Sequence, residues 1–151
     1  MAKLTLSLGS NLGDRHALLS QARRELCRQL GSLVYQSPVI STPPWGPVAQ
    51  QDYFNQVIVL SVDVPLSGPA LPAALHHILE ITQSIERQAG RLREVRWGPR
   101  TLDIDLIFLE DVIYEDARVS LPHPWWRHRS FVRDLLPSDL LDPHGRVLDA
   151  R

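Results

Sequence analysis

Two aspartates, Asp103 and Asp105, lie two positions apart in the otherwise apolar segment 102–109. Side chains alternate between the faces of a β-strand, so both carboxylates are expected on the same face. Two like charges on such a strand repel each other and lose hydration, and they stay ionised beside a cation or in water. Mg²⁺ prefers carboxylate oxygens and leaves positions open for phosphate oxygens. The pair therefore indicates either a divalent-metal site or a strand with one solvated face.

Five arginines crowd the approach to this acidic strand. The guanidinium group offers a planar fork of donors that suits phosphate oxygens, and it keeps its charge at working pH. Each arginine alone is more typical of a solvated helix end or loop than of a binding site. Beside the paired acids, the cluster predicts a site that binds a triphosphate together with metal ions. Its members are Arg87, Arg91, Arg93, Arg96 and Arg100.

A proline-rich loop over residues 42–51 is a candidate for binding a planar ring. Its prolines fix the backbone, while Trp45 and nearby Tyr53 offer flat aromatic faces. Asn55 offers both a donor and an acceptor to the edge of such a ring. The structural alternative is a rigid surface loop with Trp45 packed into the core.

Residues 121–131 form a second cluster of polar and aromatic side chains. His123 lies between two prolines, and Arg129 follows a pair of tryptophans. A histidine beside prolines is usually structural, so the cluster predicts a functional contribution only because it follows the acidic strand closely.

Hydrophobic periodicity predicts the elements that must position these residues. Asp14 is expected near the start of the first helix and Gly31 near its end. The order strand, helix, strand, strand, helix, strand predicts an α+β fold of ferredoxin-like βαββαβ topology, with helices on one face of an antiparallel sheet, plus a C-terminal extension. The predicted strands are 3–8, 33–40, 54–62 and 100–109, and the helices cover 18–30 and 75–85.

Length and composition limit the alternatives. A chain of 151 residues suits one domain, residues 1–151. The net charge of −1 does not favour nucleic acid or a membrane surface as a partner. Cys27 is the single cysteine, which fits a reducing compartment. Without a recognisable signal peptide or a membrane-length apolar run, the expected location is the cytoplasm.

Several motifs, taken in order, resemble the 6-hydroxymethyl-7,8-dihydropterin pyrophosphokinase family of folate biosynthesis. The block from Arg96 to Asp105 is highly specific for that family, and the resemblance extends to about residue 145. It implies a ferredoxin-like fold and an ATP-dependent transferase, a kinase that moves pyrophosphate from MgATP to the pterin hydroxymethyl group and releases AMP. The other matching segments are Leu8–Asp14, Thr42–Pro47, Tyr53–Asn55 and Pro122–Pro124, with Arg129 and Phe131.

The same resemblance implies individual roles. Asp103 and Asp105 would hold two Mg²⁺ ions, and Arg91 and Arg100 would grip phosphates as AMP leaves. Trp97 would lie on a mobile lid over residues 89–99. The implied pterin site comprises Thr42, Pro43, Pro44, Trp45, Gly46, Tyr53, Asn55 and Phe131. The implied ATP site comprises Gln83, Glu86, Arg91, Arg93, Trp97, Arg100, Leu106, Arg118, His123 and Arg129.

The expected partners are therefore two small molecules, ATP and the pterin, bound by a monomer that uses neither nucleic acid nor a membrane. Two other classes stay open. A metal-dependent nuclease or phosphodiesterase would also use paired acids, and an RNA-binding module of similar fold would use exposed aromatic residues. The rigid proline loop and the small net charge argue against both. The segment 64–72 and Glu94 depart from the family pattern.

Overall fold

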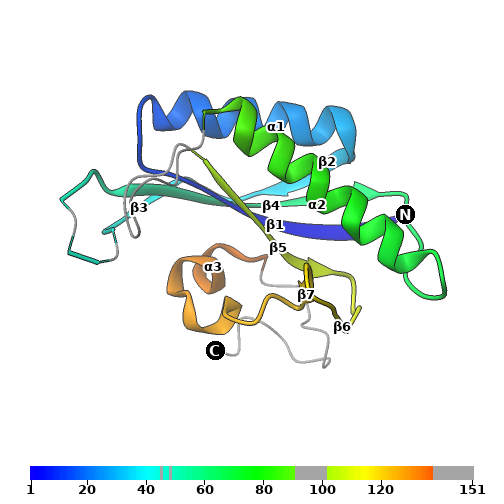
Figure 1. Ribbon diagram of the computed structural model, residues 1–151. Coiled ribbons are helices and arrows are strands. Elements are labelled where there is room, and N and C mark those ends of the chain that lie inside the picture. Colours follow the sequence, from blue (N-terminus) through cyan, green and yellow to red (C-terminus); the bar gives the residue numbers. More distant parts are fainter. Residues whose placement is uncertain (45, 48, 91–101, 138–151) are drawn as a thin grey trace.

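The computed structural model describes residues 1–44, 46–47, 49–90 and 102–137 (Figure 1). Seven strands and four helical segments follow one another along these residues. The strands are β1 (Ala2–Ser10), β2 (Gly31–Gln36), β3 (Ile40–Thr42), β4 (Tyr53–Val62), β5 (Asp103–Leu109), β6 (Tyr114–Glu115) and β7 (Ser120–Leu121). The helices are α1 (Arg15–Gln29), α2 (Leu71–Gln88), the short 3₁₀ helix η1 (Trp126–His128) and α3 (Ser130–Leu135).

One antiparallel sheet organises the molecule. Its strand order is β2-β4-β1-β5, and β3 pairs with β4 beyond the end of β2. Figure 1 shows α1 and α2 side by side on one face of the sheet, with α3 on the other side. The predicted combination of an antiparallel sheet with packed helices is therefore confirmed.

The segment predicted as one strand over residues 33–40 is divided in two, so that prediction was wrong in detail. Pro38 has no N–H to donate to a sheet and interrupts the pairing. Ser37 keeps the chain attached to β4, because its N–H donates to the Val57 carbonyl oxygen and its hydroxyl accepts from the Val57 N–H, both at 2.9 Å. The strand pairing then resumes at Ile40.

Helix α1 begins where the sequence predicts. The Asp14 carboxylate accepts a hydrogen bond from the Ala17 N–H at 3.1 Å, which satisfies one of the free amides of the first turn. Helix α2 begins four residues earlier than the predicted range, with a proline in its first turn. In the part of the chain that the structure describes, no helix has the length and apolar character to cross a membrane.

The sheet separates two hydrophobic cores. The first lies under α1 and α2 and contains every second residue of β1, namely Leu4, Leu6 and Leu8. The second lies on the opposite face and is closed by η1 and α3, which the sequence reasoning did not predict as separate elements. Its members are Val57, Ile107, Phe108, Trp126, Val132, Leu135 and Leu136.

A β-bulge in β5 determines which face carries the acids. Asp105 pairs with Ser7, whereas Phe108 pairs with Thr5, so β5 has one extra residue, Ile107. Ile107 and Phe108 consequently both reach the second core. Because the neighbouring Leu6 and Leu8 of β1 point into the first core, Ser7 and its partner Asp105 point to the second face.

Candidate active site

The predicted metal ligands and the predicted pterin reader lie in one cross-strand row. Asp103 of β5 pairs with Gly9 of β1, and Gly9 pairs on its other side with Asn55 of β4. These partners share the face that is turned away from α1 and α2. A Cβ atom added to Gly9 would lie 3.2 Å from the Asn55 Oδ1 atom. A larger residue at position 9 would therefore crowd the Asn55 amide, and glycine avoids this contact.

Asn55 is held in a fixed orientation. Its side chain is buried, with 4% exposure, and its Nδ2 atom donates to the Thr42 hydroxyl at 2.5 Å. Thr42 belongs to β3 and pairs with Tyr53 of β4. Because the amide nitrogen is engaged by Thr42, the Oδ1 atom is the one beside Gly9. The structure thus brings together three residues of the predicted pterin site.

The rest of the predicted pterin site is divided between two segments. Pro43, Pro44 and Gly46 follow β3, and Gly46 has a positive φ of 86°, a conformation that glycine adopts without strain. Phe131 lies on α3 and packs against the second core, on the same side of the sheet as Asn55. Trp45 lies outside the described residues.

An arginine from the C-terminal segment reaches the acidic strand. Arg129 Nη1 lies 2.9 Å from Asp105 Oδ2, and both side chains are about one-third exposed, at 37% and 36%. An ion pair with this exposure contributes little to stability, roughly 0–1 kcal/mol. It does, however, hold one carboxylate in place from a segment 24 residues away in sequence.

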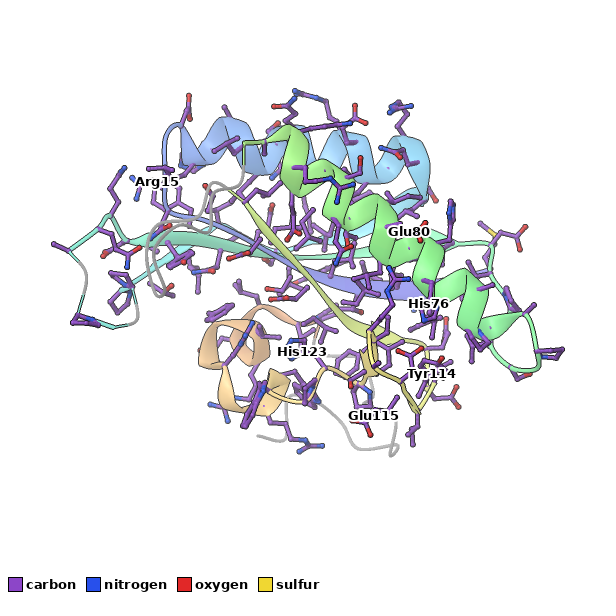
Figure 2. The ribbon with its side chains drawn as sticks, viewed as in Figure 1. Arg15, His76, Glu80, Tyr114, Glu115 and His123 are labelled. Atoms are coloured by element: carbon purple, nitrogen blue, oxygen red, sulfur yellow. The ribbon has the colours of Figure 1, made fainter. Side chains whose placement is uncertain are left out.

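His123 lies close enough to Asp105 and Arg129 for both charges to affect its pKa. Burial lowers the pKa of its imidazole, the nearby Arg129 charge lowers that pKa further, and Asp105 opposes the shift by raising it. The Nδ1 atom accepts a hydrogen bond from the Trp125 N–H at 3.2 Å. A neutral His123 therefore carries its proton on Nε2 and can donate it to an anionic oxygen. Figure 2 shows His123 on the side of the sheet away from α1 and α2.

The donor chemistry of this face fits Mg²⁺. Asp103 and Asp105 are two carboxylates that remain partly exposed at the end of β5. Mg²⁺ is commonly held by one or two carboxylates together with substrate phosphates, and it keeps several waters. The adjacent cation of Arg129 supplies positive charge for such a phosphate.

Glu86 of α2 was predicted to line the ATP site, and the structure gives it a definite contact with the acidic strand. Its side chain is buried, and Oε2 accepts from the Ile104 N–H at 2.8 Å. Ile104 is the residue between the two aspartates. Glu86 therefore fixes the backbone that carries both carboxylates.

Other predicted ATP residues are dispersed around this point. Leu106 lies in the first core opposite Leu6, on the face away from the carboxylates. Gln83 is exposed on α2, and Arg118 is exposed in the turn between β6 and β7. Their nucleotide contacts stay predictions. Arg91, Arg93, Trp97 and Arg100 lie outside the described residues.

Sequence reasoning assigned no role in the site to Gly9 beyond a turn. A glycine at the end of a strand can mark a place where two groups approach closely, and this was the available signal. The contacts of Asp105 with Arg129 could not be read from spacing, because they depend on how η1 and α3 fold back over the sheet.

Comparison with known proteins gives a consistent result. The family described as "7,8-dihydro-6-hydroxymethylpterin-pyrophosphokinase (HPPK)" matches residues 5–139. The 2-amino-4-hydroxy-6-hydroxymethyldihydropteridine pyrophosphokinase of Methylorubrum extorquens is 39% identical over 133 residues, which cover 87% of this chain and 78% of that protein. The proteins of the same name from Mycobacterium tuberculosis (39% identity, 97% of this chain and 76% of the relative) and Porphyromonas gingivalis (38%, 88% and 87%) are similarly related.

Solved structures agree at the level of the fold. A Plasmodium falciparum HPPK-DHPS, crystallised with SDX-DHP, matches with a TM-score of 0.65 and 12% identity over 99% of this chain. An HPPK-DHPS in complex with substrates matches with a TM-score of 0.67 and 11% identity, also over 99% of this chain. The present chain spans less than half of those two longer chains, 43% and 42%.

Proposed function

The chain belongs to the 7,8-dihydro-6-hydroxymethylpterin pyrophosphokinase family, and on that premise we propose that its pterin and metal sites meet across Gly9. The activity is transfer of pyrophosphate from ATP to 6-hydroxymethyl-7,8-dihydropterin, a step of folate biosynthesis. ATP is the co-substrate. The observation that carries the spatial proposal is the row Asn55, Gly9, Asp103.

The pterin end of the site is proposed to be polar at one edge and aromatic on its faces. The Asn55 Oδ1 atom would accept from a ring N–H, since it is the amide atom beside Gly9 and the bond from Nδ2 to Thr42 fixes the amide orientation. Tyr53 and Phe131 lie on the same side of the sheet as Asn55 and would pack against the two faces of the pterin ring. Pro43, Pro44, Trp45 and Gly46 complete the proposed set.

The phosphate end is proposed to be held by acids and cations together. Asp103 and Asp105 would hold Mg²⁺, two ions in the proposal, which when bound neutralises the charge of the β- and γ-phosphates. Arg129 orients Asp105, and neutral His123 donates from Nε2 toward a phosphate oxygen. Glu86 binds the Ile104 amide and so fixes the backbone between the two carboxylates.

In the proposed reaction the pterin hydroxyl oxygen forms a bond to the β-phosphorus of ATP. The bond between that phosphorus and the oxygen bridging to the α-phosphate breaks, so AMP leaves and the hydroxyl proton passes to solvent. No protein nucleophile is required, because alignment and charge neutralisation supply most of the catalysis in such transfers. Arg91 and Arg100 are proposed to stabilise the leaving group, and Gln83, Arg93, Trp97, Leu106 and Arg118 to complete the nucleotide site.

We further propose that the sheet is ferredoxin-like and that the C-terminal segment from β6 onward is an extension of that unit. The strand order β2-β4-β1-β5 with α1 and α2 on one face supports this assignment. Residues 1–151 are proposed to form one domain that acts as a monomer in the cytoplasm, without a nucleic-acid or membrane partner.

A product analysis tests the reaction. The purified chain is incubated with MgATP and 6-hydroxymethyl-7,8-dihydropterin, and the nucleotides are separated by anion-exchange chromatography. AMP is expected in equal amount to the pyrophosphorylated pterin, and a reaction without pterin should yield none. ADP or free phosphate as the main product would contradict the proposal.

A further inference from the structure

A second polar cluster lies away from the proposed metal site, between α2 and the hairpin of β6 and β7. Its centre is Asp116, at the beginning of the hairpin turn. Asp116 Oδ2 accepts from the Tyr114 hydroxyl and from His76 Nε2, both at 2.6 Å. Its Oδ1 accepts from the Arg118 N–H at 2.7 Å and from the Val119 N–H at 2.8 Å. One carboxylate thus collects four donors.

These bonds keep the carboxylate ionised. The bond from Tyr114, followed by the two backbone N–H bonds, holds the pKa of Asp116 well below its ordinary value. The same contact raises the pKa of the Tyr114 phenol. At neutral pH the cluster is therefore a fixed anion surrounded by neutral or cationic donors.

The cluster adds polar contacts between α2 and the hairpin, which already share the first core through residues such as Leu75 and Leu121. His76 lies on α2, whereas Asp116 and Tyr114 belong to the hairpin, and Figure 2 shows His76 and Tyr114 facing the space between them. The same helix fixes the acidic strand through Glu86, ten residues further on. Helix α2 therefore holds both the carboxylates of β5 and the turn that carries Arg118.

Arg118 depends on this support for its position. Its side chain is 45% exposed, and its contact with Glu80 is long, 3.9 Å, with Glu80 itself 63% exposed. An exposed pair of this kind restrains a side chain weakly. The stronger restraints act on its backbone: the Asp116 carboxylate binds the Arg118 amide, and the next residue, Val119, is buried in the first core.

We propose that Asp116 and His76 are a positioning pair that fixes the turn from which Arg118 binds the nucleotide. The proposal rests on the proposed function, in which Arg118 belongs to the ATP site. A side chain carried by a fixed turn binds its ligand more tightly than one on a loose turn, because less conformational entropy is lost on binding. His76 and Asp116 act through Arg118 and touch no substrate.

The test compares His76→Ala with His76→Gln. The glutamine Nε2 atom can replace the donor of the imidazole, whereas alanine removes it. Binding of α,β-methylene-ATP with Mg²⁺, which cannot release AMP, is measured by titration calorimetry. His76→Ala should weaken nucleotide binding about 3- to 10-fold, the size expected when one more side chain must be immobilised. His76→Gln should restore most of the affinity, and pterin binding should stay unchanged in both variants.

A double-mutant cycle separates positioning from general support. If His76 acts through Arg118, His76→Ala should weaken nucleotide binding in the wild-type background but change it less than about twofold in an Arg118→Ala background. His77→Ala is the matched control, since exposed His77 lies about 100° further around the same helix. Thermal unfolding of each variant verifies that the fold persists.

Three outcomes would overturn the proposal. Equal weakening of nucleotide and pterin binding, or an unchanged effect of His76→Ala in the Arg118→Ala background, would give the pair a purely structural role. Unaltered nucleotide binding by Arg118→Ala would remove the target of the pair. None of these results would affect the proposed reaction, which fails only if wild-type protein forms no AMP in the product analysis.

Discussion

The two strand carboxylates have unequal surroundings. Asp105 is paired with Arg129, and His123 lies within reach of the charge of both residues. Asp103 instead pairs with Gly9 of β1, which has no side chain. Across Gly9, Asp103 also lies nearer than Asp105 to the proposed pterin reader Asn55.

Removal of either charge should abolish most of the activity. Asp103→Asn and Asp105→Asn retain size and should remain folded, but each loses a proposed metal ligand. A loss of several kcal/mol of transition-state stabilisation corresponds to a decrease in kcat of about 100-fold or more. The rate of AMP release at saturating substrates measures this, with circular dichroism as the folding control. Near-normal rates in both folded variants would reduce these residues to an ordinary solvated strand face.

The cluster around Asp116 makes a prediction about acid stability. Because its folded-state pKa lies below the ordinary 3.8, the carboxylate stabilises the fold above that pH and loses this contribution as the pH falls below it. Asp116→Asn should therefore lower the free energy of unfolding at pH 7, and its difference from wild type should shrink between pH 4 and pH 2.

Urea unfolding at a series of pH values measures that difference. Exposed Asp63 provides the control, because Asp63→Asn should follow the wild-type curve. A difference for Asp116→Asn that stays constant down to pH 2 would show that the loss at neutral pH comes from something other than the ionised carboxylate.

For single residues, the sequence predicts which face of a strand a side chain occupies better than it predicts which residues that side chain contacts. The spacing of Asp103 and Asp105 was sufficient to place both on one face, because strand alternation is local. The bond from Ile104 to Glu86 and the burial of Leu106 in the first core depend on how α2 and β1 pack, and no local pattern contains that information.

At the level of elements, strong periodicity was a reliable guide. The two long helices and strands β1, β4 and β5 appear where alternation or helical spacing predicted them, with ends shifted by a few residues. The errors fell where pairing is short or irregular. Pro38 divided one predicted strand, and β6, β7, η1 and α3 are too short to produce a period.

The junction of α1 and β2 depends on a glycine. A Cβ atom on Gly31 would lie 2.0 Å from the Ser61 carbonyl oxygen of β4, and this is backbone, which cannot move aside easily. Gly31→Ala should lower the free energy of unfolding by roughly 3 kcal/mol, the upper end of the usual cost of overpacking. Chemical denaturation of the purified variant provides the measurement.

Gly68→Ala separates this clash from backbone strain. Gly68 has a φ of 80°, but an added Cβ would meet no atom within 4 Å, so its substitution should cost about 1–2 kcal/mol from strain alone. If Gly31→Ala proves no more destabilising than Gly68→Ala, β2 must be able to move away from β4.

On the scale of the whole molecule, both cores share one sheet. Val57 of β4 and Phe108 of β5 belong to the second core, while their strand neighbours Ile58 and Leu109 belong to the first. If the strands separate, the side chains of both cores become exposed together. The described part of the chain should therefore unfold in one cooperative step.

Differential scanning calorimetry tests this prediction. The calorimetric and van't Hoff enthalpies should agree within error, and the magnesium complex of α,β-methylene-ATP should raise the single midpoint. Two resolved transitions would indicate that the C-terminal segment folds independently of the sheet, and a midpoint that does not respond to nucleotide would argue against binding.

The irregular edge strands of the sheet affect how readily copies of this chain aggregate. A flat, uninterrupted edge strand is a template for aggregation. Here the register of β2 shifts between Leu33 and Tyr35, and on β5 the Glu86 carboxylate occupies the Ile104 amide. The Ile104 amide is therefore unavailable to another copy, and the register shift makes the β2 edge irregular. The contact that aligns the two carboxylates thereby also hinders amyloid-like stacking.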